Sequence, residues 1–263
     1  MIGPLNDEDS SIELIHSTSS GPLGVINAAR CSYAGSSDKM GPREKRLGGF
    51  LWDKDHTSPF RHTYYTFSIT APIFTFRQWM KYQVGSVWRT FEVDGQEVSL
   101  ETFDHFYDID KGCSWNELSG RYAQFEHKYY IPRSKDIRGQ SKSNKQGSED
   151  NLGIPGQLGA WSVLRAAYEA SFGNYIRLIE LGVAREQARM ILPQNLYSRA
   201  YWTVSLQGLL HFLNQRLKED AQWEIRQYAK ATMKLVEEDL TSLGVSLSSL
   251  VDPVSNTNMK VNG

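Results

Sequence analysis

Apolar and polar residues alternate along parts of the first half of the chain, as they do in half-buried β-strands. The clearest case is "FRHTYYTFSITAP", residues 60–72, whose β-branched and aromatic residues predict a strand. Residues 73–82 predict a helix, because the preceding Pro72 is favoured at a helix start. Residues 122–131, "YAQFEHKYYI", predict another strand before Pro132.

Two other segments interrupt this pattern. Residues 87–114 contain "VDGQEV" between short strand-like runs, which predicts a hairpin within an inserted excursion. Residues 134–153, "SKDIRGQSKSNKQGSEDNLG", are rich in Gly, Ser and charged residues and predict a mobile loop.

Beyond residue 153 the apolar spacing changes to three and four, which predicts helices. Gly182 is predicted to end the first helix, and Pro193 to end a short second one. Asp220 is the candidate N-cap of the fourth helix. The tail from Thr241 is expected to fray. The apolar stripes consist of Leu158, Trp161, Leu164, Tyr168, Phe172, Tyr175 and Ile179 in the first helix, Trp202, Leu206, Leu209, Leu213 and Leu217 in the third, and Ile225, Ala229, Met233, Val236 and Leu240 in the fourth.

A strand-rich half followed by a helical half, with no repeat and no linker, predicts an α+β fold. We expect one domain over residues 1–263, with a mixed sheet, a helical half and an excursion near 87–114.

Composition narrows the classes of function. A net charge of −1 over 263 residues gives no broad attraction to nucleic acid or membrane surfaces. Two cysteines form no disulfide framework, and six scattered histidines have no metal-ligand spacing. With no signal-peptide pattern at the N-terminus, we expect a soluble cytoplasmic protein without a metal.

Arginine and amide side chains recur within aromatic or apolar segments. Arg185 and Arg189 are four residues apart and can share one helix face, where they could clamp a phosphate or simply occupy a solvated helix end. Arg216 precedes "LKED", so a surface ion pair is its simplest interpretation. Glu117 and Arg121 lie in the polar cluster "NELSGRY" between aromatic runs, and they could pair with each other or bind a ligand.

Six blocks together carry a family resemblance. They are "HTSPF" (56–60), "APIFTFRQW" (71–79), "WNELSGRY" (115–122), "YIP" (130–132), "REQARMILP" (185–193) and "FLNQR…AQWEIRQYA" (212–229). In this order they resemble the flavin-dependent thymidylate synthases, the ThyX family, and "NELSGRY" and "AQWEIRQYA" are the most specific of them.

The resemblance implies C5-methylation of a uridine monophosphate without an enzyme nucleophile. Methylenetetrahydrofolate would supply the carbon, FAD the hydride and NADPH the reducing equivalents. The protein's share is then binding, orientation and electrostatics. Family members are homotetramers with sites shared between subunits, so the resemblance implies UMP or dUMP as the partner and the same assembly.

The resemblance also implies roles for individual positions. Substrate-binding residues would be Gln78, Glu117, Ser119, Gly120, Arg121, Arg189 and Arg216. Of these, Ser119 to Arg121 and Arg189 would hold the phosphate. Arg216 would be the catalytic contact to the uracil, where a guanidinium stabilises negative charge developing on the ring. FAD would contact Ser32, His56, Ser58, Lys81, Tyr82, Gln83, Asn116, Glu117 and His211.

The chain departs from the family in two places. Lys81-Tyr82-Gln83 stands where the family has Arg-His-Arg, and the segment up to "WNELSGRY" is about 28 residues longer than the family spacing. An altered acceptor is therefore expected, as in the ThyX-type methylases of UMP and dUMP from nucleoside-antibiotic pathways such as polyoxin. The alternatives are a non-catalytic nucleotide- or flavin-binding homologue and an ordinary dUMP-only synthase.

Overall fold

The computed structural model describes residues 1–80, 87–93, 96–102, 113–145, 147–149 and 152–251. The strand order of its main sheet is β1 (Ser11–Ser17), β2 (Tyr64–Pro72), β8 (Tyr197–Ser205), β5 (Cys113–Glu117). All three neighbouring pairs run antiparallel, so the expectation of a mixed sheet was wrong although the α+β class holds. The helices between β1 and β2 return the chain to the end where β1 stops, and Thr18 N donates to Tyr64 O there, so β2 must run back along β1.

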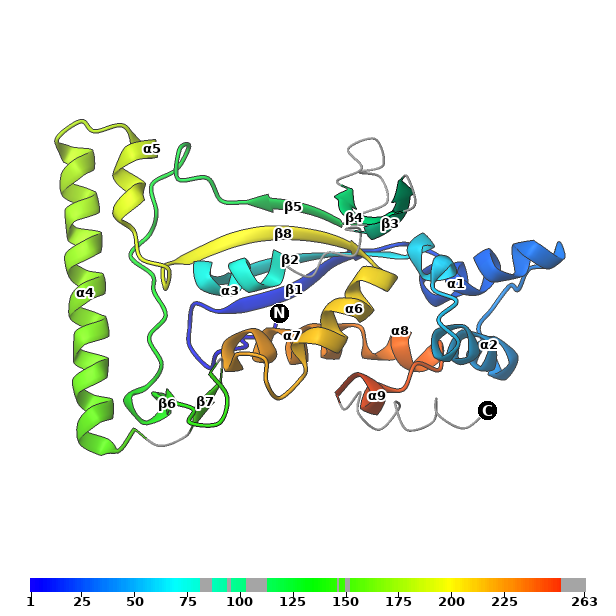
Figure 1. The fold of residues 1–263 in the computed structure, drawn as a ribbon. Helices are drawn as coiled ribbons and strands as arrows, with labels where there is room; N and C mark the ends of the chain where they lie inside the picture. Colours follow the sequence, from blue (N-terminus) through cyan, green and yellow to red (C-terminus); the bar gives the residue numbers. More distant parts are fainter. Residues whose placement is uncertain (81–86, 94–95, 103–112, 146, 150–151, 252–263) are drawn as a thin grey trace.

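Helices pack on the sheet and at its two ends (Figure 1). The helices α6 and α7 lie across the sheet with α3, whereas α1 and α2 lie at one end and α4 stands upright at the other. Their bounds are α1 (Gly21–Arg30), α2 (Pro42–Asp53), α3 (Ile73–Trp79), α4 (Ile154–Glu180), α5 (Arg185–Ala188), α6 (Leu206–Arg216), α7 (Trp223–Leu235), α8 (Glu237–Ser242) and α9 (Leu247–Val251).

The main core lies between the sheet and the helices α3, α6 and α7. Trp79 of α3 stacks on Phe212 of α6 with ring centroids 4.8 Å apart and meets Trp202 of β8 edge-on at 5.3 Å. Tyr228 of α7 approaches the same indole at 5.7 Å. Because a buried aromatic ring contributes about 3–5 kcal/mol, this cluster fixes the end of α3 against α6.

A second, smaller core joins the C-terminal half of α4 to the loop before residue 130. Tyr168, Phe172 and Tyr175 are buried there, as the predicted stripe requires. The N-terminal half of the same helix leaves Leu158 53 % and Val163 68 % exposed. Half of this helix therefore presents apolar side chains to the outside of the single chain.

Several predicted elements are confirmed. The strand over 60–72 is β2, the long first helix is α4, and the short one is α5 followed by a 3₁₀ turn, Arg189–Ile191. The predicted hairpin is present as β3 (Val87–Val93) paired with β4 (Gln96–Thr102).

Others were wrong. Residues 197–205 form β8, so the third helix begins at Leu206, where the buried Ser205 side chain accepts from Gly208 N. Residues 122–131 contain one isolated bridge, Tyr129 to Leu196, and two of their aromatic rings, Phe125 and Tyr129, pack in the core formed with α4. The N-cap position of α7 is Gln222 and not Asp220. The tail expected to fray from Thr241 forms α9 up to Val251, and residues 252–263 of that tail lie outside the described residues.

The segment predicted as a mobile loop forms hydrogen-bonded structure in its described part. It contains a 3₁₀ turn, Ser134–Asp136, and the short pair β6 (Gly139–Gln140) and β7 (Ser148–Glu149). This pairing fixes the position of Arg138, which precedes β6.

Candidate active site

One group of the predicted residues lies where β5 ends. Glu117 pairs with Ala200 of β8 in the sheet, and the chain then turns through Ser119 to Arg121, with Arg121 N donating to Ser119 Oγ at 3.3 Å. Gly120 is buried in this turn, where a Cβ would stand 2.4 Å from a ring carbon of Phe125 and 3.1 Å from Cδ of Arg189. The structure therefore brings the "SGR" turn against Arg189, with room for backbone but not for a side chain, as an anion cradle requires.

The Glu117 carboxylate is held by its neighbours in the sheet. Ser198 Oγ donates to Glu117 Oε1 at 3.0 Å and Trp115 Nε1 to Oε2 at 3.4 Å. The Arg121 guanidinium lies over the Tyr122 ring at 5.5 Å, and among the described residues no ion pair joins it to Glu117, whose carboxylate accepts from Ser198 and Trp115. The local-pair interpretation of this cluster is therefore wrong.

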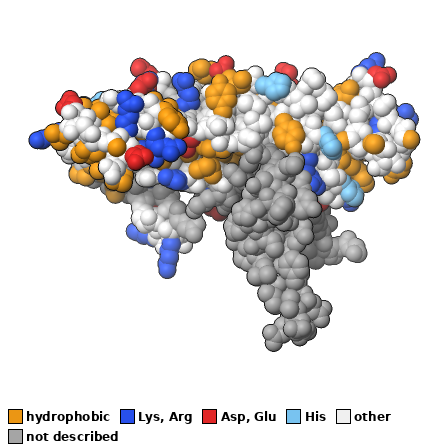
Figure 2. All heavy atoms as spheres, turned by 90° about the horizontal axis from the view of Figure 1, so that it is seen from above, with side chains coloured by type: hydrophobic (Ala, Val, Ile, Leu, Met, Phe, Trp, Pro, Cys, Tyr) orange, Lys and Arg blue, Asp and Glu red, His pale blue; other side chains and the backbone are white. Residues whose placement is uncertain are grey.

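Arg185 of α5 and Arg189 of the following 3₁₀ turn differ in their contacts. Arg185 Nη1 donates to the backbone carbonyl of Tyr122 at 3.1 Å and so ties α5 to the turn. Arg189 is exposed beside Gly120. Seen from above, Lys and Arg side chains gather over the α4–α5 end of this face (Figure 2). Arg121, Arg185 and Arg189 therefore bring positive charge to the turn, which favours an anionic ligand.

A second group joins α3 to α6. Arg216 is only 8 % exposed, and its Nη2 donates to the backbone carbonyl of Gln78. Burial rules out the surface ion pair that the sequence favoured. The side chain of Gln78 donates from Nε2 to Oε1 of Gln222, the residue that precedes α7.

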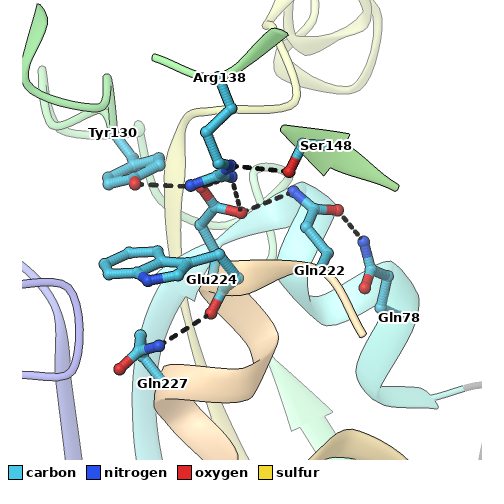
Figure 3. Close-up of polar contacts among 8 residues, drawn as sticks. Gln78, Tyr130, Arg138, Ser148, Gln222, Glu224 and Gln227 are labelled. Carbon is cyan, nitrogen blue, oxygen red and sulfur yellow. Dashed lines mark hydrogen bonds and ion pairs between the residues drawn. The ribbon is translucent and has the colours of Figure 1, made fainter. Parts of the chain in front are cut away.

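Behind Gln78 lies a buried carboxylate, Glu224 in the first turn of α7 (Figure 3). It is 2 % exposed and accepts from Gln222 Nε2 at 2.9 Å, from Tyr130 OH at 3.2 Å and from Arg138 Nη2 at 2.9 and 3.2 Å. Burial and the nearby carboxylate raise the pKa of the Tyr130 phenol, so it stays protonated and donates. The carboxylate also benefits from the positive end of the helix dipole.

A third group lies among α1, the 3₁₀ turn Ser58–His62 and α6. Ser32, His56 and Ser58 are exposed there. Gln207 Nε2 donates to Thr57 Oγ1 at 3.0 Å and so ties α6 to this segment. His211, one turn further along α6, shares the face of Gln207.

This third group carries donors and acceptors for a polar ligand such as a flavin nucleotide. Burial, with a smaller contribution from Lys218, lowers the pKa of His211, so its imidazole is neutral at pH 7 and can both donate and accept. The hydroxyl and imidazole groups of this set fit a cofactor with sugar and phosphate oxygens.

The first and third groups lie at opposite ends of β8. The turn Ser119–Arg121 follows the pairing of Glu117 with Ala200, and α6 follows the last residue of β8, Ser205. From Ala200 to Ser205 the strand rises by five residues, about 17 Å, so the turn and the start of α6 are separated by at least this part of β8 in one copy of the chain. Asn116 lies between them, exposed on β5 opposite Tyr201. The predicted residues Lys81, Tyr82 and Gln83 lie outside the described residues.

A cavity of about 420 Å³ lies between α4, the loop that carries Tyr130 and the start of α7. Phe74, Tyr168 and Arg138 are among its lining residues, whereas none of the predicted site residues lines it. Nowhere in the described part of the chain do three or more His, Cys, Asp or Glu side chains form a group that could hold a metal ion. The described helices include none long and apolar enough to cross a membrane.

Sequence reasoning missed Ser198, Arg138 and Glu224. Glu224 lies inside "AQWEIRQYA", so its position within a family block was a usable signal. Arg138 lies in the segment predicted as a mobile loop, and Ser198 in the unpredicted strand β8, so neither carried a signal.

Comparison with known proteins places this geometry in a family. The family described as "Thymidylate synthase complementing protein" matches residues 13–240. The flavin-dependent thymidylate synthase of Thermus thermophilus is 38 % identical over 214 residues, which cover 81 % of this chain and 67 % of that protein. The Kosmotoga olearia protein of the same name is 35 % identical over 217 residues, covering 81 % and 79 %.

Solved structures support the same family assignment. The chain is similar to the UMP/dUMP methylase PolB of Streptomyces cacaoi bound with 5-Br dUMP, at a TM-score of 0.67 and 30 % identity over 90 % of this chain and 97 % of that one. The same methylase bound with 5-Br UMP matches at a TM-score of 0.67 and 29 % identity, over 91 % and 96 %. The chain is a member of the flavin-dependent thymidylate synthase family.

Proposed function

We propose that this protein is a flavin-dependent methylase that adds a methyl group to carbon 5 of a uridine monophosphate without an enzyme nucleophile. FAD, when bound, supplies the hydride chemistry, with methylenetetrahydrofolate and NADPH as co-substrates. The observation that carries the proposal is the buried Arg216, which is held against Gln78 in a chain of this family.

Each group of residues takes one task. The turn Ser119-Gly120-Arg121 and Arg189 bind the phosphate, because backbone N–H groups and guanidinium forks match phosphate oxygens. Gln78 and Glu117 orient the nucleotide. The buried guanidinium of Arg216 stabilises negative charge on the uracil ring, and its burial makes that interaction stronger than it would be in water.

Ser32, His56, Ser58, Asn116, Glu117 and His211 bind the flavin, with Lys81, Tyr82 and Gln83 as further contacts. The phosphate turn lies beside Ala200, and the His211 group lies beyond Ser205, about 17 Å further along β8, which supports a site completed by a second subunit. The exposed apolar half of α4 supports the same conclusion, since such a surface is stabilised by burial between subunits. We propose a homotetramer with shared sites, located in the cytoplasm and binding neither nucleic acid nor membrane.

The similarity to PolB supports the choice of acceptor, since that protein is named a UMP/dUMP methylase and its structures are bound with 5-Br dUMP and with 5-Br UMP. We propose that this chain accepts UMP as well as dUMP. The two substrates differ by one hydroxyl, and a pocket that gives that hydroxyl a partner accepts both.

The first experiment is the absorbance spectrum of the purified protein. Bound flavin gives a visible band that NADPH bleaches, and a nucleotide that binds near the flavin shifts this band. A colourless protein that takes up no added FAD contradicts the proposal and leaves the non-catalytic homologue, whose nucleotide binding can be measured separately.

A further inference from the structure

A chain of hydrogen bonds leads from Gln78 into the interior, away from the nucleotide groups. It passes through the Gln222 amide to the Glu224 carboxylate (Figure 3). Arg138 and Tyr130 also donate hydrogen bonds to this carboxylate. Three segments that are far apart in sequence therefore meet at one buried carboxylate. A buried charge is retained only where its partners are in place, so this arrangement is rigid.

The chain of bonds has one direction. A carboxylate paired with an arginine only accepts, so the Gln222 amide must turn its Nε2 towards Glu224 and its Oε1 towards Gln78. Gln78 must then donate from Nε2, and the amide atom it turns away from Gln222 is an acceptor. The orientation of the Gln78 amide is thus set by Glu224, which is connected to Gln78 through two hydrogen bonds and the Gln222 side chain.

Arg138 is fixed as firmly as the carboxylate. Its Nε donates to Ser148 Oγ at 3.0 Å, and its guanidinium lies 5.7 Å from the centre of the Trp223 ring. The β6–β7 pair therefore holds the cation that fixes Glu224. The segment 134–149 contributes to the site through this contact.

We infer that Gln222, Glu224 and Arg138 are positioning residues that act through Gln78. They set which atom of the Gln78 amide faces the nucleotide, so that Gln78 accepts a hydrogen bond from an N–H or O–H of the uridylate. The inference rests on the proposed function, because it takes Gln78 as a nucleotide contact.

Gln222 is the residue to change, because its side chain is exposed and its loss leaves the buried ion pair intact. Gln222→Ala removes both bonds of the relay and should weaken dUMP binding to the flavin-loaded protein about 3- to 10-fold, the effect of one ordinary hydrogen bond. Gln227→Ala is the matched control, because Gln227 donates only to Trp223 O, one turn along the same helix.

A double-mutant cycle separates positioning from general destabilisation. When Gln78→Ala is already present, adding Gln222→Ala should cause no further loss of dUMP affinity. The Gln78→Ala single variant and the double variant should have equal melting temperatures. If the two losses multiply, or if Gln222→Ala binds as tightly as Gln227→Ala, the positioning role is wrong. A wild-type protein that binds no uridylate overturns the proposed function itself, whereas normal binding with a failed cycle overturns only this inference.

Discussion

The buried guanidinium of Arg216, at the C-terminal end of α6, donates to the backbone carbonyl of Gln78 in α3, 138 residues away in sequence. Trp79, the next residue, stacks on Phe212 of the same α6 helix. Aromatic packing therefore fixes the two helices, and the hydrogen bond fixes the direction of the cation.

Replacing Arg216 tests its assigned role. Arg216→Lys keeps the charge but loses the fork that reaches Gln78 O, so turnover should fall about 100-fold or more, the usual cost of losing a fixed charge-stabilising donor. Arg216→Ala should abolish turnover. Both variants should retain wild-type size on gel filtration, and a wild-type rate in either would refute the role.

Gly120 should tolerate no side chain. In Gly120→Ala the new Cβ would stand 2.4 Å from Phe125, so the turn or Arg189 must shift, and we expect at least tenfold weaker nucleotide binding, measured by calorimetry. Gly173→Ala in α4 is the control, because a Cβ there meets nothing within 4 Å. That change should leave binding intact and raise helix stability by about 0.5–1 kcal/mol. Equal nucleotide affinities in the two variants would contradict the proposed packing of the turn.

Arg189 is expected to recognise the phosphate and not the base. Arg189→Ala should weaken dUMP binding about 10- to 100-fold, the range for charge-assisted hydrogen bonds, while deoxyuridine binding stays unchanged. The exposed Arg133, which pairs with Asp136, gives the control variant Arg133→Ala. A parallel loss for nucleotide and nucleoside would assign Arg189 to the fold instead.

His211 predicts a pH dependence of stability. Its pKa is lower in the folded protein because of burial, so in acid the unfolded chain binds the extra proton more readily. Stability should therefore fall as the pH drops below the ordinary histidine value of about 6.5. The melting temperature of His211→Asn should fall less than that of the wild type between pH 7 and pH 5, and equal falls would contradict the shift.

Local patterns were sufficient to predict α4 and the strand β2. The alternation along β2 reflects one packed face, and the spacing along α4 reflects a stripe that is buried in its C-terminal half at Tyr168, Phe172 and Tyr175. β8 was missed because it is an inner strand of the sheet and Trp202 continues the helical spacing of Leu206 and Leu209. Its pairing with β2 and β5 outweighs that local period.

The candidate site was predicted residue by residue only through the family blocks. From the neighbouring sequence alone, Arg216 was interpreted as a surface residue. Its burial depends on α3, which is distant in sequence. The Glu224–Arg138 pair could not be predicted, because it joins a helix to a polar segment without periodicity.

The most direct measurement is the mass of the nucleotide after incubation with the protein, FAD, NADPH and methylenetetrahydrofolate. Parallel reactions contain UMP or dUMP, with Arg216→Ala as the inactive control. The account predicts that both nucleotides gain one methyl group at carbon 5. Methylation of dUMP alone would contradict the proposed acceptor range, and a flavin-loaded protein that methylates neither would contradict the account as a whole.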